Sequence, residues 1–155
     1  MVTTPDGSLV AMVHSNNGTT DLNAWVNLFK EFADSIGADV DMNQMYGTLY
    51  NKALEGDADC GGILSYGNYA GEPITNVEKG RPMVVRTPET KFNLANFMRS
   101  HLYTALGVIK VGMDILTKDE GVEIDTVLGH GGLFKTKGVG QKILADAINT
   151  PVVVM

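Results

Sequence analysis

The sequence predicts an α/β fold in which parallel strands are joined by helices. The C-terminal third contains a strand pattern over 124–128, a glycine-rich loop over 129–136, a helix over 139–148 and a strand over 151–155. A strand, a helix and a strand in this order form a right-handed crossover between parallel strands. Hydrophobic residues make up 44% and charged residues 19% of the 155-residue chain, which is typical of one globular domain with a core.

The N-terminal third predicts a strand followed by two helices. Residues 9–14 are the strand candidate. Apolar residues then recur at spacings of three and four: Leu22, Trp25, Phe29, Phe32 and Ile36. This spacing predicts an amphipathic helix that ends at Gly37. Asp41 and Gln44 resemble a capping box, and the apolar residues behind them predict a second helix, which Gly56 ends.

The middle of the chain combines an irregular segment with the longest helix. Short strands are expected at 61–66 and 83–86, and the remainder of 67–91 is expected to be irregular. The strongest periodic pattern follows: Leu94, Phe97, Met98, Leu102, Ala105, Ile109, Met113 and Leu116. It predicts a helix of about seven turns.

Both ends of the chain have the character of internal segments. Residues 4–8 form a turn that enters a strand, and residues 151–155 contain three β-branched residues in succession. Three such residues in a row suit a strand that is covered on both faces. We therefore expect the chain to be part of a longer protein.

Charge and cysteine content limit the classes of function. Lys and Arg number 12 against 18 Asp and Glu, which argues against a broad basic face for nucleic acid. A polyanionic ligand held by backbone amides stays compatible with this charge. Cys60 is the single cysteine, so a disulfide framework is excluded and a cytoplasmic protein is expected. No apolar run approaches the length of a membrane-spanning helix, about 18 residues.

The sharpest candidate for a binding site is the segment 128–137, called the glycine loop below. Glycines between a strand and a helix let backbone N–H groups and the helix N-terminus face an anion such as phosphate. The loop is not a Walker A motif, because Lys137 precedes Gly138 rather than following a glycine, and Gly-x-Gly-x-x-Gly is absent as well. A tight turn that leads into the helix explains the same residues, and both interpretations stay open.

A second candidate lies in the polar segment 16–23. It follows one predicted strand and precedes the start of a helix, as the glycine loop does. Because the carboxyl ends of parallel strands meet at one edge of a sheet, where ligands of α/β folds bind, the two segments are expected to open on the same edge. The alternative is a helix N-cap, with Thr20 or Asp21 bonding the free amides.

The remaining reactive side chains favour no further site. The histidines, His14, His101 and His130, lack metal-ligand spacing, and with one cysteine a structural zinc site is not expected. Asp57 and Asp59 flank turns and are expected to be solvated. Cys60 is expected to be a small buried hydrophobe. No catalytic residue and no metal ligand is therefore predicted.

Four ordered segments resemble the FGGY carbohydrate kinases. From Gly131 to Val152 the chain has a glycine pair, a short loop, a helix ending in Ala-Asp and a Pro-Val strand, as the C-terminal lobe of that family does. The segments 21–25, 71–73 and 96–116 resemble, in order, the family's Trp-containing helix, its Gly-Glu turn and its long helix. The loop length is most similar to ribulokinase-like and xylulokinase-like members.

The resemblance implies an actin-like, ribonuclease H-like ATPase lobe, a mixed sheet with flanking helices. Residues 1–155 are then one domain, the C-terminal nucleotide-binding lobe of a two-lobe sugar kinase whose N-terminal lobe is absent. The implied cofactors are ATP and Mg²⁺. Gly131 and Gly132 would approach the nucleotide, Lys137 would occupy the polar contact position and Thr20 would lie near the nucleotide at the other helix start.

The implied reaction is transfer of the γ-phosphoryl group of ATP to a sugar hydroxyl, with a pentulose such as xylulose or ribulose as the sugar. The family's catalytic Asp lies in the other lobe, so the 155-residue chain alone is expected to be inactive. Two departures are Lys137, where the family often has Asn or Ser, and His130, where it often has glycine.

The expected partners are the sugar substrate and the missing N-terminal lobe, with neither nucleic acid nor a membrane. A homodimer is left open. Two alternatives also stay open. One is a non-enzymatic actin-like nucleotide-binding module, and the other is a stand-alone α/β domain for a different phosphorylated metabolite.

Overall fold

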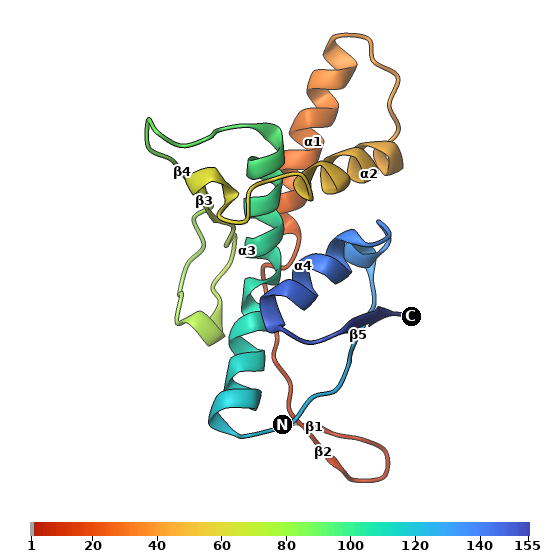
Figure 1. The fold of residues 1–155 in the computed structure, drawn as a ribbon, viewed down its shortest axis with the longest axis vertical. Helices are drawn as coiled ribbons and strands as arrows, with labels where there is room; N and C mark the ends of the chain where they lie inside the picture. Colours follow the sequence, from red (N-terminus) through yellow and green to blue (C-terminus); the bar gives the residue numbers. More distant parts are fainter. Residues whose placement is uncertain (1) are drawn as a thin grey trace.

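A computed structural model describes residues 2–155, and the long helix α3 (Leu94–Asp114) runs through the centre of the molecule (Figure 1). It packs against three shorter helices: α1 (Thr20–Ser35), α2 (Met42–Ala53) and α4 (Val139–Ile148). Met98 and Leu102 of α3 are completely buried between them. The core of the domain is therefore formed by helices around α3, and the strands lie at its margins.

The strands form three separate two-stranded sheets. Two are antiparallel and one is parallel: β1 (Val2–Thr3) with β2 (Leu9–Val10), β3 (Leu64–Tyr66) with β4 (Met83–Val85), and β5 (Val127–Gly129) parallel to β6 (Val152–Val154). The parallel pair has the predicted strand, loop, helix and strand order, with α4 as the crossover. Val127 is paired with Val152, and α4 has the predicted bounds.

The structure differs from the expected sheet in two ways. The expected mixed sheet is divided into pairs, because the strand predicted at 9–14 pairs only over Leu9–Val10 and the chain then leaves the sheet. The strand predicted at 151–155 is not covered on both faces. Val153 is 52% and Met155 73% exposed, because β6 pairs only with β5 and packs on α4.

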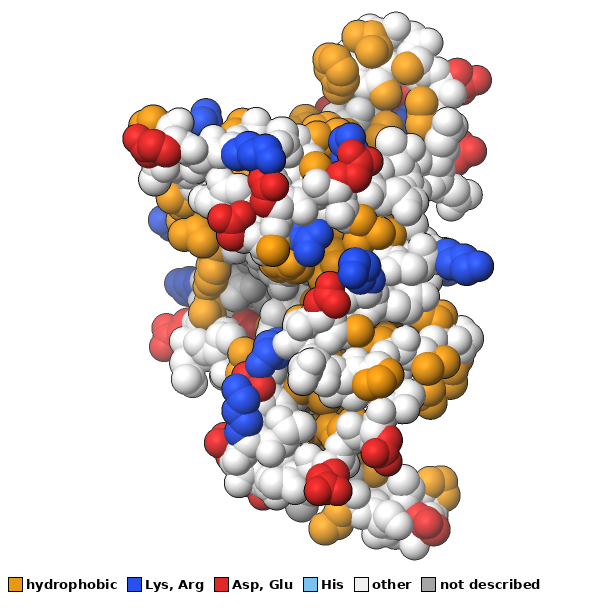
Figure 2. All heavy atoms as spheres, viewed as in Figure 1, with side chains coloured by type: hydrophobic (Ala, Val, Ile, Leu, Met, Phe, Trp, Pro, Cys, Tyr) orange, Lys and Arg blue, Asp and Glu red, His pale blue; other side chains and the backbone are white. Residues whose placement is uncertain are grey.

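Helix α1 is buried only in its first half. Leu22 and Val26 lie in the core, but Phe32 and Ile36, which the spacing pattern placed on the apolar face, are 64% and 65% exposed. The second half of α1 and the loop that follows it extend beyond the rest of the molecule (Figure 1), and Figure 2 shows hydrophobic side chains on the surface at this end. The helix itself is confirmed within two residues of its predicted start.

Short helical turns complete the chain. They are three 3-10 turns, η1 (Cys60–Gly62), η2 (Pro73–Thr75) and η4 (Gly132–Phe134), and a π turn, η3 (Ile115–Asp119), which ends α3. The strand predicted at 61–66 therefore begins later, at Leu64. The predicted cap of α2 is confirmed, because the Asp41 side chain accepts a hydrogen bond from the Gln44 amide at 2.9 Å. Among residues 2–155, no helix is long and apolar enough to cross a membrane.

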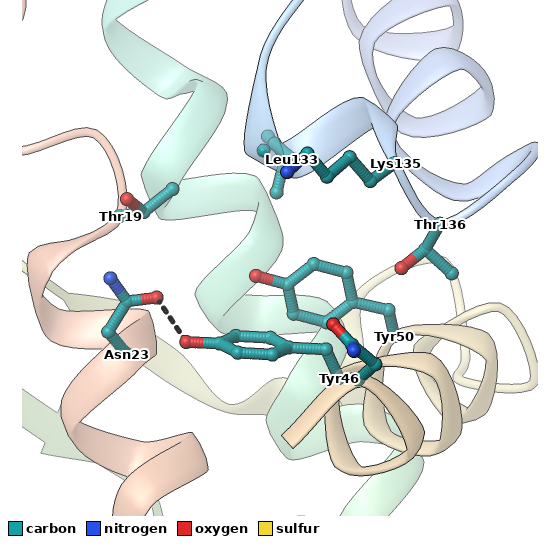
Figure 3. A pocket seen from close by; sticks show the side chains of 9 residues that line it. Thr19, Asn23, Tyr46, Tyr50, Leu133, Lys135 and Thr136 are labelled. Carbon is teal, nitrogen blue, oxygen red and sulfur yellow. Dashed lines mark hydrogen bonds between the residues drawn. The ribbon is translucent and has the colours of Figure 1, made fainter. Parts of the chain in front are cut away.

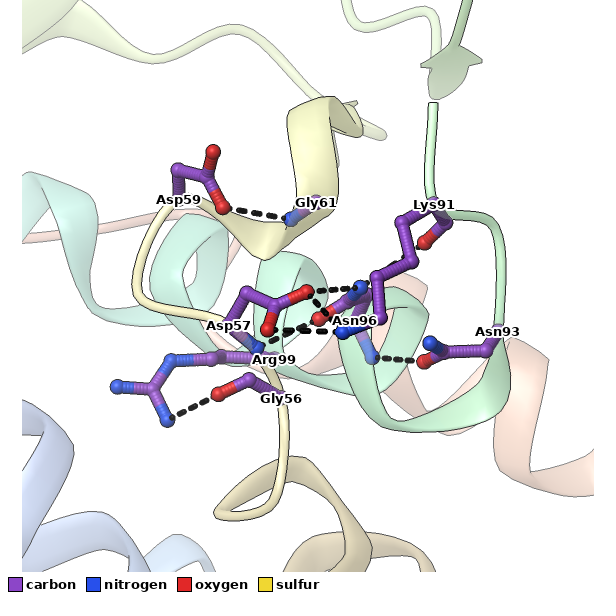
Figure 4. Close-up of polar contacts among 8 residues, drawn as sticks. All are labelled: Gly56, Asp57, Asp59, Gly61, Lys91, Asn93, Asn96 and Arg99. Carbon is purple, nitrogen blue, oxygen red and sulfur yellow. Dashed lines mark hydrogen bonds and ion pairs between the residues drawn. The ribbon is translucent and has the colours of Figure 1, made fainter. Parts of the chain in front are cut away.

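Asn96, in the first turn of α3, connects this helix to two neighbouring segments (Figure 4). Its side-chain Nδ2 donates to the Asp57 carboxylate at 3.0 Å and to the Lys91 carbonyl at 2.9 Å, and its Oδ1 accepts from the Asp57 amide at 2.7 Å. Asn93 caps the helix by accepting from the Asn96 amide. Asp57 is therefore a structural anion, bonded to Asn96 and paired with Lys91.

Candidate functional site

A cleft of about 450 Å³ lies between the glycine loop, the start of α1 and one side of α2 (Figure 3). Nine residues line it: Thr19, Asn23, Asn43, Tyr46, Tyr50, Gly132, Leu133, Lys135 and Thr136. They come from three segments that are far apart in the sequence. The lining combines two aromatic rings with amide and hydroxyl groups, one lysine and one glycine, which is the mixture of apolar surface and convergent polar groups typical of a ligand site.

The glycine loop is held to α4 by Phe134. A Cβ atom at Gly129 would lie 2.8 Å from Cε1 of Phe134, and one at Gly140 would lie 3.1 Å from Cδ1. The ring therefore fills the space that these two glycines leave open. This packing holds η4 in place, so that Gly132 at its start faces the cleft.

Two tyrosines of α2 form the opposite side of the cleft. The rings of Tyr46 and Tyr50 meet edge to face, with centroids 5.5 Å apart. The Tyr46 hydroxyl donates a hydrogen bond to Oδ1 of Asn23 at 3.0 Å, which joins α2 to α1 (Figure 3). The two rings give this side of the cleft an apolar surface that carries polar hydroxyl groups.

The predicted site residues lie at or beside this cleft. Gly132 lines it, whereas Thr20, Gly131 and Lys137 are each the immediate neighbour of a lining residue. The structure thus brings the two candidate segments together, although packing around α3 does so rather than the shared edge of one sheet. Contact of the four predicted residues with a nucleotide stays a prediction. Their sequence neighbours and the α2 side chains were not predicted.

The N-cap interpretation of the segment 16–23 is wrong for both residues it named. Thr19, not Thr20, is the capping residue of α1, and its side chain makes no capping hydrogen bond. Asp21 is buried instead of capping the helix. One of its carboxylate oxygens lies 3.0 Å from Nδ1 of His101 on α3, so this side chain joins two helices.

Glu72 holds the turn that precedes Thr19. Its side chain is completely buried, and one carboxylate oxygen, Oε2, accepts three hydrogen bonds. The donors are the Ser15 hydroxyl at 3.1 Å, the Asn16 amide at 3.0 Å and the Asn17 side chain at 3.0 Å. A segment distant in sequence therefore determines where α1 begins, and with it the α1 side of the cleft.

His101 is a packed core residue, as the sequence predicts. Its ring lies 4.4 Å from the Phe97 ring, and Nδ1 also meets the Ser65 hydroxyl at 2.9 Å. Burial lowers the pKa of His101 below its ordinary value of 6.5, because desolvation of the charged ring outweighs the attraction of Asp21. The neutral ring is thus the form that fits the folded protein.

Stability is expected to fall as the pH is lowered from about 7.5 to about 5.5. Because the folded pKa of His101 is depressed, the unfolded chain takes up a proton below pH 6.5 that the folded chain does not. The measurement is Tm against pH for the natural chain and for His101→Gln. The Tm of His101→Gln should fall less over this pH range than the Tm of the natural chain. An equal fall in both proteins would show that His101 is not responsible.

The single cysteine, Cys60, lies in the core. Cys60 is 4% exposed within the core, and burial raises the pKa of its thiol, so it acts as the small hydrophobe that was predicted. Among residues 2–155, no group of three His, Cys, Asp or Glu side chains is placed to hold a metal ion.

Comparisons with known proteins identify a family and a solved structure with a similar fold. The family model for the FGGY family of carbohydrate kinases, C-terminal domain, matches residues 1–155. A crystal structure of xylulose kinase from Bifidobacterium adolescentis is similar in fold, with a TM-score of 0.64 and 18% sequence identity. The similarity covers 90% of this chain and 25% of that one, so the chain spans about a quarter of that enzyme. No curated protein matches the sequence.

Proposed function

Because the chain belongs to the FGGY family of carbohydrate kinases, whose C-terminal domain matches its whole length, we propose that it is the ATP-binding lobe of a two-lobe sugar kinase. On this proposal residues 1–155 form one actin-like, ribonuclease H-like domain. The N-terminal lobe is its partner, and the parallel pair β5–β6 belongs to the mixed sheet of the complete lobe. The cleft between the glycine loop and α2 carries the proposal.

The lining of the cleft supports the proposal at both ends of an ATP molecule. The tyrosine rings of α2 provide a surface for the base. On the opposite side, Gly132 leaves backbone exposed beside Lys135, and exposed amides with a cation are a phosphate-binding arrangement. Mg²⁺ would enter with the phosphates, which supply part of its ligand set. The net negative charge of the chain is compatible with this, because the anion is held by local groups.

The reaction proposed for the complete enzyme is phosphoryl transfer from ATP to a sugar hydroxyl, with a pentulose as the sugar. This lobe holds and orients the nucleotide, and closure against the other lobe excludes water. The base that accepts the hydroxyl proton is assigned to the other lobe. The 155-residue chain is therefore expected to bind ATP without transferring its phosphoryl group.

Gly132→Ala is expected to weaken ATP binding about tenfold, which corresponds to ~1.4 kcal/mol. A Cβ atom at Gly132 meets nothing within 4 Å, and the residue is not in the left-handed region, so the variant should fold normally. The added methyl group lies on the cleft lining, where the backbone would approach the phosphates. Calorimetric titration of the purified chain with ATP measures the effect.

Gly107→Ala on α3 is the matched control. A Cβ atom there is equally free of contacts, and Gly107 does not line the cleft. Its ATP affinity should equal that of the natural chain. Equal affinities in all three proteins would contradict the placement of ATP at the glycine loop. Binding of sugar phosphates but not of ATP would favour the stand-alone metabolite-binding domain.

A further inference from the structure

Tyr50 is a buried tyrosine of α2 whose polar group lies at the cleft. The residue is 3% exposed on α2, and its side chain lines the cleft (Figure 3). Among residues 2–155, its hydroxyl makes no hydrogen bond with another group of the protein. The buried polar atoms that lack both a partner and solvent contact are Glu72 Oε1, His101 Nε2 and Gln141 Oε1. The Tyr50 hydroxyl is not one of them, because it opens on the cleft.

The other tyrosine hydroxyls near the core are bonded. The Tyr46 hydroxyl donates to Asn23 at 3.0 Å, and the Tyr103 hydroxyl accepts from Nε of Arg99 at 2.9 Å. Burying a tyrosine costs free energy unless its hydroxyl finds a partner, which is why buried tyrosines are usually bonded. Tyr50 departs from this pattern at the place where a ligand would lie.

The chemical state of this hydroxyl suits a hydrogen-bond donor. Desolvation, reinforced by the neighbouring Tyr46, raises the pKa of Tyr50 well above its ordinary value of 10.0. The phenol therefore keeps its proton across the physiological pH range. Figure 3 shows the hydroxyl of Tyr50 on the cleft side of its ring, on the same side as the hydroxyl of Tyr46.

We propose that Tyr50 is a specificity-determining residue whose hydroxyl donates a hydrogen bond to the nucleoside part of bound ATP. The inference rests on the proposed function and names the recognition contact within it. The nucleoside is assigned to the α2 side of the cleft because both tyrosine rings lie there. Lys135, which would contact the phosphates, lies on the glycine loop across the cleft. Ring nitrogens of a purine and ribose oxygens are the acceptors that the phenol would meet.

Tyr50→Phe tests the contact by removing one oxygen atom. Because that atom has no partner among residues 2–155, Tm is expected to stay unchanged. The affinities for ATP and for adenosine are both expected to fall about tenfold, the value of one hydrogen bond to a buried donor. Both are measured by calorimetry on the purified 155-residue chain.

Two further variants separate the ends of the ligand. Lys135→Gln should weaken the binding of ATP and leave adenosine unaffected, because adenosine has no phosphate. Tyr103→Phe removes a phenol oxygen outside the cleft lining and should change neither affinity. Of the three variants, Tyr50→Phe alone is therefore expected to bind both ATP and adenosine more weakly.

Any other result contradicts either the proposed function or the inference about Tyr50. If the natural chain binds no ATP, the proposed function fails and the inference fails with it. If ATP binds and Tyr50→Phe binds ATP and adenosine as tightly as the natural chain does, the inference alone is wrong. If Tyr50→Phe binds ATP more weakly but binds adenosine as the natural chain does, the hydroxyl does not contact the nucleoside, which contradicts the inference. A fall in the Tm of Tyr50→Phe would show that the hydroxyl is bonded within the protein, which also overturns the inference.

Discussion

Replacement of Gly61 by alanine is expected to lower the free energy of unfolding by about 3–5 kcal/mol. Gly61 has a φ of +60°, where a side chain is strained. A Cβ atom there would also lie 2.3 Å from Nδ2 of Asn96 and 2.8 Å from the Lys91 carbonyl oxygen. Strain and overlap therefore act together at this position.

Asn96 has no freedom to give way. It is 1% exposed, and its amide is bonded on both sides, to Asp57 and to the Lys91 carbonyl (Figure 4). A shift of this side chain would leave a buried amide and the Asp57 carboxylate without partners, which is costly in itself. Relaxation therefore has to come from the backbone between α2 and β3.

Gly62→Ala is the matched control for this prediction. Gly62 is also left-handed, with a φ of +83°, but the nearest atom to a Cβ there is the Thr90 hydroxyl at 3.7 Å. Only the conformational cost of about 1–2 kcal/mol is expected. Denaturant unfolding followed by circular dichroism measures both variants. Equal losses would show that overlap with Asn96 contributes nothing.

Glu72→Ala is expected to cost about 3 kcal/mol, by leaving donors of Ser15, Asn16 and Asn17 without their acceptor. The turn before Thr19 is then no longer held in place. We expect ATP affinity to fall as well, because Thr19 lines the cleft. Unfolding and calorimetric titration of the same variant measure the two effects.

Glu72→Gln removes the negative charge of the side chain but keeps one acceptor oxygen. The natural side chain uses Oε2 for all three donors, whereas Oε1 has no partner. Glutamine can keep one oxygen in the Oε2 position and place its nitrogen at the other. We expect the glutamine variant to lose about 1 kcal/mol and to retain most of its ATP affinity. A glutamine variant as unstable as the alanine variant would mean that the negative charge, rather than the acceptor oxygen, holds the turn.

The helices were predictable because their signals are local. The bounds of α4 follow from apolar spacing after Gly138, and the start of α2 follows from Asp41 and Gln44, three residues apart. The strand expected over 9–14 was not obtained beyond Val10. The residues after it, from Ser15 onward, are bonded to Glu72, and a partner more than fifty residues away leaves no periodic signal.

The site was predictable in outline only. Glycines between a strand and a helix, and a polar segment before another helix, identified two of its three sides. The third side, on α2, was missed because Tyr46 and Tyr50 have the spacing of core residues, and spacing does not show that one hydroxyl opens on a cleft. At the start of α1 the lining residue is Thr19, the neighbour of the predicted Thr20, and Asp21 turns inward to reach His101.

The uneven burial of α1 means that its amides will not exchange with solvent at one rate. Its first turns share the free energy of global unfolding, because Leu22 and Val26 lie in the core and Asp21 contacts His101. The turns that end at Ser35 open by local fluctuations of lower free energy. Asn23, whose amide donates to the Thr19 carbonyl at 2.8 Å, belongs to the slowly exchanging end. The cleft is thus built on the rigid end of α1, while the projecting end can move without changing the shape of the cleft.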